Sequence, residues 1–147
     1  MSLFKKKDFF SATEKEQITE AINLAEKQTS GEIRVFIENK NPFVDPIDRA
    51  AEIFFKLKMD QTTERNAVLL YIATKHKELA LFADEGIYKK VGKSYWDNAV
   101  KNMIAQFAKD NKLDGIKQCV RQIGETLKEK FPYASLTDKN ELSNNII

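Results

Sequence analysis

Residue types that commonly build active sites are scarce in this chain of 147 residues. The one cysteine, Cys119, cannot form an internal disulfide or a zinc site, which fits a reducing compartment and leads us to expect a cytoplasmic protein. The one histidine, His76, excludes a zinc site of several histidines and makes a histidine-based triad a poor candidate. The five glycines lack the spacing of a phosphate-binding loop.

Long apolar runs are also missing. The longest, residues 67–73, is far shorter than the roughly 20 residues that cross a membrane, so no membrane span is expected. The first ten residues, MSLFKKKDFF, contain three consecutive lysines but lack the apolar stretch of a signal peptide. They allow weak peripheral contact with an anionic membrane, or form a short leader whose phenylalanines pack on the domain.

The composition is that of a folded globular protein, with 42% hydrophobic and 31% charged residues. Because the 24 basic and 22 acidic residues nearly cancel, no nucleic-acid partner is expected. The length suits a single domain. We expect a leader over residues 1–10, one domain over residues 11–133 and a loose tail over residues 134–147.

Helix signals come first along the chain. Ser11 and Glu14 have capping-box spacing, and an apolar stripe follows them. Gly31 follows this helix and is able to take the left-handed conformation that closes many helices. Asp45 and Pro46 predict the start of a second helix. Apolar stripes predict two further long helices; one contains Trp96 and Ile104 among its apolar residues and the other ends near residue 132.

Three strands are predicted between these helices. Residues 32–38 alternate with the period of a strand, and residues 67–73 are apolar on both faces, as in a central strand. Residues 78–84 follow after only four residues, so that pair should form an antiparallel hairpin. A helical crossover makes the first two strands parallel. We therefore predict an α/β fold, a Rossmann-like three-layer α/β/α sandwich with a small mixed sheet.

This topology brings three loops together at one end of the sheet. The predicted cluster of carboxylates is Glu32, Asp60, Glu64, Asp84 and Glu85, joined by Arg65 and Asn66. Hard cations such as calcium or magnesium bind oxygen ligands of this kind. Crowded carboxylates repel one another, so either a cation or Arg65 should lie among them. Three alternatives remain open: solvated loop charges, a metal site, or an anion site using Arg65 and a helix N-terminus. Arg65 and Asn66 are the candidate contacts for an anion or substrate.

Five motifs follow one another along the chain: TSGEIRV at residues 29–35, ERNAVLLYIA at residues 64–73, ELALFAD at residues 78–84, EGI at residues 85–87, and Val91-Gly92 followed by Trp96. In their order and spacing they resemble the TPM domain family. The resemblance covers roughly residues 11–132. It implies a small α/β/α sandwich, divalent-cation binding with calcium reported among relatives, and weak acid phosphatase activity in plant relatives.

One motif departs from the family pattern. Many relatives have Asp-Asn-Gly before the second strand, whereas this chain has Arg65-Asn66-Ala67. The position of the family carboxylate therefore carries the opposite charge here.

The sequence supports three functional hypotheses. The first is a binding or regulatory module that uses a divalent cation, calcium or alternatively magnesium, to order the three loops. The second is a metal-assisted phosphomonoesterase, with Asp84 as a metal ligand and Arg65 as a clamp for negative charge. The third is a metal-independent domain that interacts with an as yet unknown protein. The first needs only oxygen ligands, whereas the second needs a nucleophile or base that the sequence does not identify.

Overall fold

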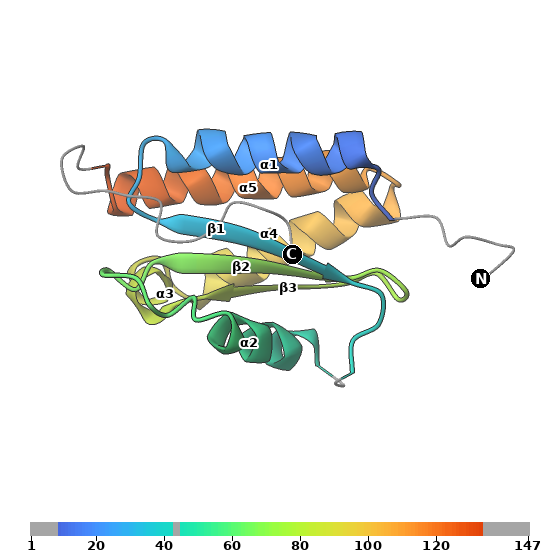
Figure 1. Ribbon diagram of the computed structural model, residues 1–147, viewed down its shortest axis with the longest axis horizontal. Coiled ribbons are helices and arrows are strands. Elements are labelled where there is room, and N and C mark those ends of the chain that lie inside the picture. Colours follow the sequence, from blue (N-terminus) through green and yellow to red (C-terminus); the bar gives the residue numbers. More distant parts are fainter. Residues whose placement is uncertain (1–8, 43–44, 134–147) are drawn as a thin grey trace, which may run out of the picture.

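The computed structural model describes residues 9–42 and 45–133 and places a three-stranded sheet between two helical layers. The strands are β1 (Glu32–Glu38), β2 (Ala67–Ala73) and β3 (Glu78–Ala83). One face is covered by α1 (Ala12–Glu26), α4 (Lys93–Ala108) and α5 (Lys112–Lys130), as Figure 1 shows. The opposite face is covered by α2 (Pro46–Lys56), and the short α3 (Glu85–Val91) lies at one end of the sheet. The predicted α/β sandwich is confirmed.

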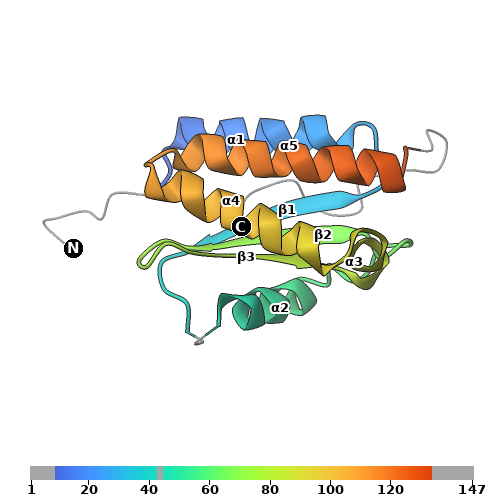
Figure 2. The same ribbon diagram turned by 180° about the vertical axis from the view of Figure 1, so that it is seen from behind.

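The strand order is β1-β2-β3, with β1 parallel to β2 and β2 antiparallel to β3. Both orientations agree with the sequence prediction. In the register, Glu32 lies beside Ala67, and Val68 lies beside Ala83. The start of β1, the start of β2 and the end of β3 therefore share one end of the sheet, while the β2–β3 hairpin turn lies at the other end (Figure 2).

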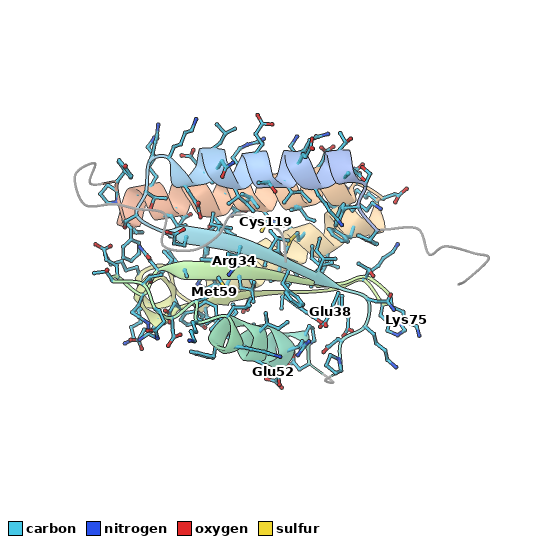
Figure 3. All side chains as sticks on the ribbon, in the orientation of Figure 1. Arg34, Glu38, Glu52, Met59, Lys75 and Cys119 are labelled. Atoms are coloured by element: carbon cyan, nitrogen blue, oxygen red, sulfur yellow. The ribbon has the colours of Figure 1, made fainter. Side chains whose placement is uncertain are left out.

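Two apolar cores hold the layers together because β2 is buried on both faces. The larger core joins Ile33, Val35 and Leu70 to the layer of α1, α4 and α5. The smaller core joins Leu69 and Tyr71 to α2. Cys119 belongs to the larger core and lies between α5 and the sheet (Figure 3).

Both predicted helix starts, at Ser11 and at Asp45-Pro46, are confirmed by their capping hydrogen bonds. Ser11 and Glu14 each accept a hydrogen bond from the other's backbone N–H, which completes the capping box. The Asp45 carboxylate accepts from the N–H of Ile47, and Pro46 occupies the first turn of α2.

Three details of the structure differ from the sequence analysis. Gly31 is not in the left-handed region, since Gly92 is the only described glycine with positive φ. Gly31 is needed for packing instead, because a Cβ there would lie 2.6 Å from Leu127 Cδ2. Ile104, expected in an apolar stripe, is 49% exposed. Strand β3 also ends one residue earlier than predicted, because Asp84 is the N-cap of α3.

At the N-terminal side of the domain, Phe10 is buried in the larger core and Phe9 stacks on Phe107. The rest of the predicted leader and the predicted tail over residues 134–147 lie outside the described residues. None of the helices within residues 9–42 and 45–133 is long and apolar enough to cross a membrane.

Candidate functional site

Three loops meet at the end of the sheet where β1 and β2 begin and β3 ends. We call residues 29–32, 60–66 and 84–86 together the three-loop edge. The second and third loops are joined by the backbone, since the Arg65 carbonyl accepts hydrogen bonds from the N–H groups of Gly86 (2.8 Å) and Ile87 (3.3 Å). The backbone N–H of Asp84 donates a hydrogen bond to the Ala67 carbonyl at the start of β2 (2.9 Å).

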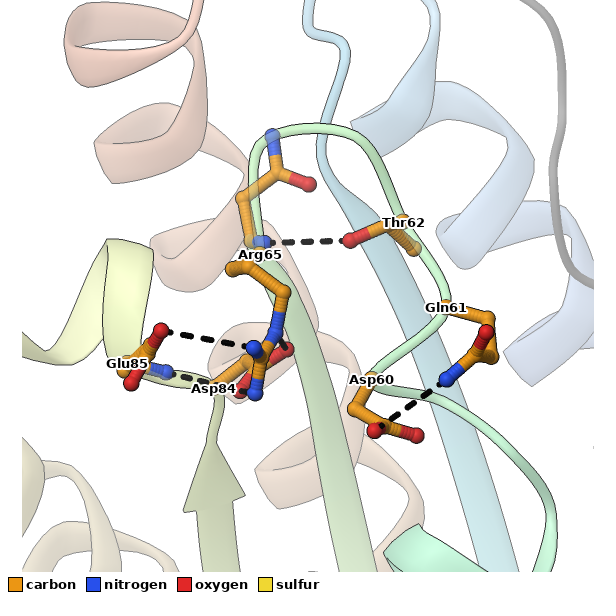
Figure 4. A network of polar contacts seen from close by, with 7 residues as sticks. Asp60, Gln61, Thr62, Arg65, Asp84 and Glu85 are labelled. Atoms are coloured by element: carbon orange, nitrogen blue, oxygen red, sulfur yellow. Dashed lines mark hydrogen bonds and ion pairs between the residues drawn. The ribbon is translucent and has the colours of Figure 1, made fainter.

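Arg65 lies at the centre of the edge. Its Nε donates to Asp84 Oδ2 (2.6 Å) and its Nη2 donates to Asp84 Oδ1 (2.8 Å), a bidentate pair. Its Nη1 donates to Glu85 Oε1 (3.3 Å). Figure 4 shows the guanidinium between these two carboxylates on one side and Asp60 on the other. The hydrogen bond to Asp84 is the main cause of a raised pKa of Arg65, so the guanidinium keeps its charge at every accessible pH.

The backbone is shaped to hold this pair. Arg65 has φ of +52°, a left-handed conformation that a long side chain rarely adopts. Gly86 approaches the same turn so closely that a Cβ there would lie 2.2 Å from the Glu64 carbonyl oxygen. Asp84 is buried, with only 3% of its side chain exposed, and its Oδ1 also accepts from the N–H of Glu85 (2.8 Å). Both Asp84 oxygens are therefore occupied.

A second polar network links the first and second loops. Ser30 Oγ donates to Glu64 Oε2 (3.3 Å) and accepts from Asn66 Nδ2 (3.1 Å). The N–H of Asn66 donates to Thr62 Oγ1 (3.4 Å). Asn66 is 1% exposed, and its Oδ1 has no hydrogen-bond partner among the described residues. This orphaned carbonyl oxygen is the one unsatisfied acceptor that the structure records at the edge.

The predicted site residues are thus divided between two networks. Asp84, Glu85 and Arg65 form the first, and the charge of Asp60 acts on Arg65 from across the loop. Glu64 and Asn66 form the second. Glu32 is 2% exposed at the first position of β1, so its carboxylate is almost fully withdrawn from solvent.

A divalent cation does not fit the Asp84 network as it stands. A positive guanidinium already binds both oxygens of Asp84 and one of Glu85. Within residues 9–42 and 45–133, no group of three or more histidine, cysteine, aspartate or glutamate side chains is arranged to hold a metal ion. Arg65 thus lies among the carboxylates, one of the two arrangements that the sequence predicts.

The comparisons with known proteins agree with this fold. The family model described as the TPM domain matches residues 3–126. The chain belongs to the TPM domain family. It is similar to the BA42 protein of the psychrophilic bacterium Bizionia argentinensis, with 37% identity over 97% of each chain and a TM-score of 0.87. No curated protein is similar enough to serve as a relative.

Two more distant structures share the fold of this TPM domain. The N-terminal domain of cg2496 from Corynebacterium glutamicum has 10% identity and a TM-score of 0.63, covering 100% of this chain and 90% of that chain. The N-terminal domain of a P. gingivalis protein has 11% identity and a TM-score of 0.61, covering 83% and 78%. At these identities the likeness concerns the fold alone.

Sequence reasoning missed two residues that organise the edge of this TPM domain. Ser30 connects Glu64 to Asn66, and its position in the TSGEIRV motif was the available signal. Gly86 allows the turn around Arg65, and the signal was a glycine directly after two acidic residues. His76 lies in the hairpin turn at the far end of the sheet.

Proposed function

We propose that this TPM domain is a binding module in which Arg65 takes the place of a divalent cation at the three-loop edge. The observation that carries the proposal is the bidentate pair between Arg65 and the buried Asp84. A metal ion at such an edge would neutralise the carboxylates and hold the loops together. Arg65 supplies the positive charge from within the chain, so the loops need no added ion to stay in place.

The ligand that we expect is a protein. The Arg65 side chain is 37% exposed and that of Glu85 is 58% exposed, and Glu64 also faces solvent. Charged side chains around one arginine resemble the polar rim of a protein interface. Hydrolysis would require a nucleophile or a general base near the edge. The Asp84 carboxylate is buried and paired with Arg65, and the only histidine is at the opposite end of the sheet, which leaves the exposed carboxylates of Glu64 and Glu85 as the available bases.

A titration with metal ions tests this proposal. Chelator-treated, isotope-labelled protein is titrated with calcium and then with magnesium to millimolar concentration, and each backbone amide is followed by NMR. We expect the amides of residues 29–32, 60–66 and 84–88 to stay in place. The variant Arg65→Asp restores the acidic residue of the family motif and is expected to gain calcium-dependent shifts in these segments.

The matched control is Arg121→Asp, which makes the same charge change at an exposed position of α5. It should gain no calcium-dependent shifts at the edge. If the unaltered protein shows such shifts in the three loops, the substitution of metal by Arg65 is refuted and the edge is a cation site.

A second candidate is divalent-cation binding by the other network, and the orphaned Asn66 Oδ1 favours it. Asn66, Ser30 and Glu64 offer an amide, a hydroxyl and a carboxylate oxygen, the hard ligands that calcium prefers. With a single carboxylate, such a site would be weak. In the same titration it predicts shifts at residues 30, 64 and 66 that leave residues 84–88 unmoved.

The phosphomonoesterase alternative is tested on the same samples. Hydrolysis of p-nitrophenyl phosphate is followed with calcium, magnesium or manganese over a range of pH. We expect no hydrolysis above the buffer rate. A metal-dependent rate that disappears in Asp84→Asn would replace the binding proposal with an enzymatic one.

A further inference from the structure

A groove of about 510 Å³ runs along the outer surface of the domain between α1 and α5. The two helices lie side by side and run in the same direction (Figures 1 and 2). Lys117 Nζ donates to Gln17 Oε1 (3.4 Å) at one end, and Gln28 and Lys128 line the other end. The groove lies outside both networks of the three-loop edge, so its role is independent of the function proposed for that edge.

Small residues form the floor of this groove. Ala21 and Ala25 of α1 face Gly124 of α5, where a Cβ would lie 2.6 Å from Ala25 Cβ. The close approach of the helices leaves a groove with an apolar floor and with polar and charged side chains along its sides. Leu24 lies beside the floor with 60% of its surface exposed, the most exposed of the large hydrophobic residues described. An amphipathic partner helix would contact such a surface with apolar residues at the floor and charged residues at the sides.

The two walls differ in charge. Lys117, Arg121 and Lys128 line the α5 side, and their spacing of four and seven residues places them along one stripe of the helix. None of the three forms an ion pair with any residue in the described part of the chain. Glu125 also lies on this wall, and Glu20 lies on the α1 side. The α5 wall is therefore basic on balance, and the α1 wall is not.

The size of the groove suits one helix. From residue 17 to residue 28 the groove is roughly 16 Å long, about three turns of a partner helix that is about 10 Å wide. We propose that the α1–α5 groove binds an amphipathic helix of a partner protein, with leucines on its apolar face and acidic residues along the flank that faces α5.

A pair of synthetic peptides tests this proposal on the full chain. The first is a 15-residue helical peptide (about four turns) with leucines on one face and glutamates along one flank. The second has lysines in place of the glutamates. Binding is measured by fluorescence anisotropy and by amide shifts in the labelled protein. We expect the glutamate peptide to bind more tightly and to shift residues 17–28 and 117–128.

Two variants locate the binding surface. Leu24→Asp and Arg121→Glu should each weaken binding of the glutamate peptide by about tenfold or more, the effect of losing a central contact. The matched controls are Ile104→Asp, an exposed apolar residue of α4, and Lys101→Glu, an exposed lysine of the same helix. Both controls should leave the affinity unchanged, and circular dichroism should show that all four variants remain folded.

Several outcomes would overturn the proposal. Equal binding of the two peptides would remove the role of the basic wall, and shifts outside α1 and α5 would place the site elsewhere. A dimer in solution that Leu24→Asp converts to a monomer would make a second copy the occupant. Binding that appears only after residues 134–147 are removed would make that segment of the chain the occupant.

Discussion

Arg65 and Asp84 are nineteen residues apart in the sequence, yet the guanidinium of one binds both carboxylate oxygens of the other. The pair joins the loop before β2 to the residue after β3, so it connects two strands at the end where no turn connects them. Asp84 is buried, and Arg65 is partly exposed. Asp84 is also the N-cap of α3. Its carboxylate therefore connects the loop before β2, the end of β3 and the start of α3.

Replacing Asp84 with alanine should cost more than an ordinary helix cap. The variant Asp84→Ala loses the cap of α3, worth about 1 kcal/mol, and also the hydrogen bonds from Arg65. The matched control is Asp45→Ala, which removes the aspartate cap of α2, for which no arginine contact is recorded. Urea unfolding should give a clearly larger loss of unfolding free energy for Asp84→Ala. Equal losses would mean that the Arg65 pair adds no stability.

Gly86→Ala should strongly destabilise the domain. A Cβ at this position would lie 2.2 Å from the Glu64 carbonyl oxygen and 2.5 Å from that of Arg65. Backbone atoms cannot move aside as a side chain can, so we expect a loss of about 3 kcal/mol, the upper end for overpacking. In the control Gly31→Ala, the nearest atom is a methyl carbon of Leu127, and the loss should be smaller. Thermal and urea unfolding measure the loss of stability in both variants. If Gly86→Ala is as stable as the unaltered protein, Gly86 does not lie this close to the carbonyl oxygens of Glu64 and Arg65.

Features with local causes could be predicted from the sequence. The capping box of Ser11 and Glu14, the Asp45-Pro46 start and the alternation in residues 32–38 each depend on residues a few positions apart. The connection between β2 and β3 is too short for the crossover that parallel strands need, so the two strands must be antiparallel. From these pieces the topology follows, and it correctly brought the three loops to one end of the sheet.

Features with non-local causes could not be predicted. Helical spacing does not decide which way a stripe faces, so Ile104 was expected inside and is exposed. The seven residues of α3 are too few for a periodic pattern, so this short helix, which Gly92 separates from α4, was not predicted. The choice of Asp84 as the partner of Arg65 depends on a left-handed residue and a close glycine contact, neither of which has a periodic signature.

Cys119 should be unreactive in the folded protein. It is 4% exposed, and burial raises the pKa of its thiol to about 12. At pH 8.5 the thiolate is then roughly a thousandfold scarcer than for a free cysteine. We expect a colorimetric thiol reagent to label the native protein only as fast as it unfolds, and to label the urea-unfolded protein at once. Rapid labelling of native protein would show that α5 opens locally.

A second charged cluster lies at the far end of the sheet and links α2 to β1 and β2. Glu38 accepts hydrogen bonds from Arg49 Nε (2.8 Å), Arg49 Nη2 (3.0 Å) and Tyr71 Oη (2.5 Å). Burial alone would raise the pKa of Glu38, but the hydrogen bonds from Arg49 and Tyr71 and the charge of Arg49 outweigh it and lower the pKa. Burial and the same contact raise the pKa of Tyr71.

This lowered pKa predicts a loss of stability in acid. The unfolded chain takes up a proton on Glu38 at a higher pH than the folded chain does, so the stabilisation is fully present above about pH 5 and is lost as the pH falls further. Glu38→Gln should be less stable than the unaltered protein at pH 7 and should lose less of its remaining stability between about pH 5 and pH 3. The control is Glu20→Gln, at an exposed glutamate of α1. Urea unfolding at each pH measures how the free energy of unfolding changes with pH. If this change is the same for Glu38→Gln and for the unaltered protein, the Arg49 and Tyr71 contacts do not favour the charged carboxylate.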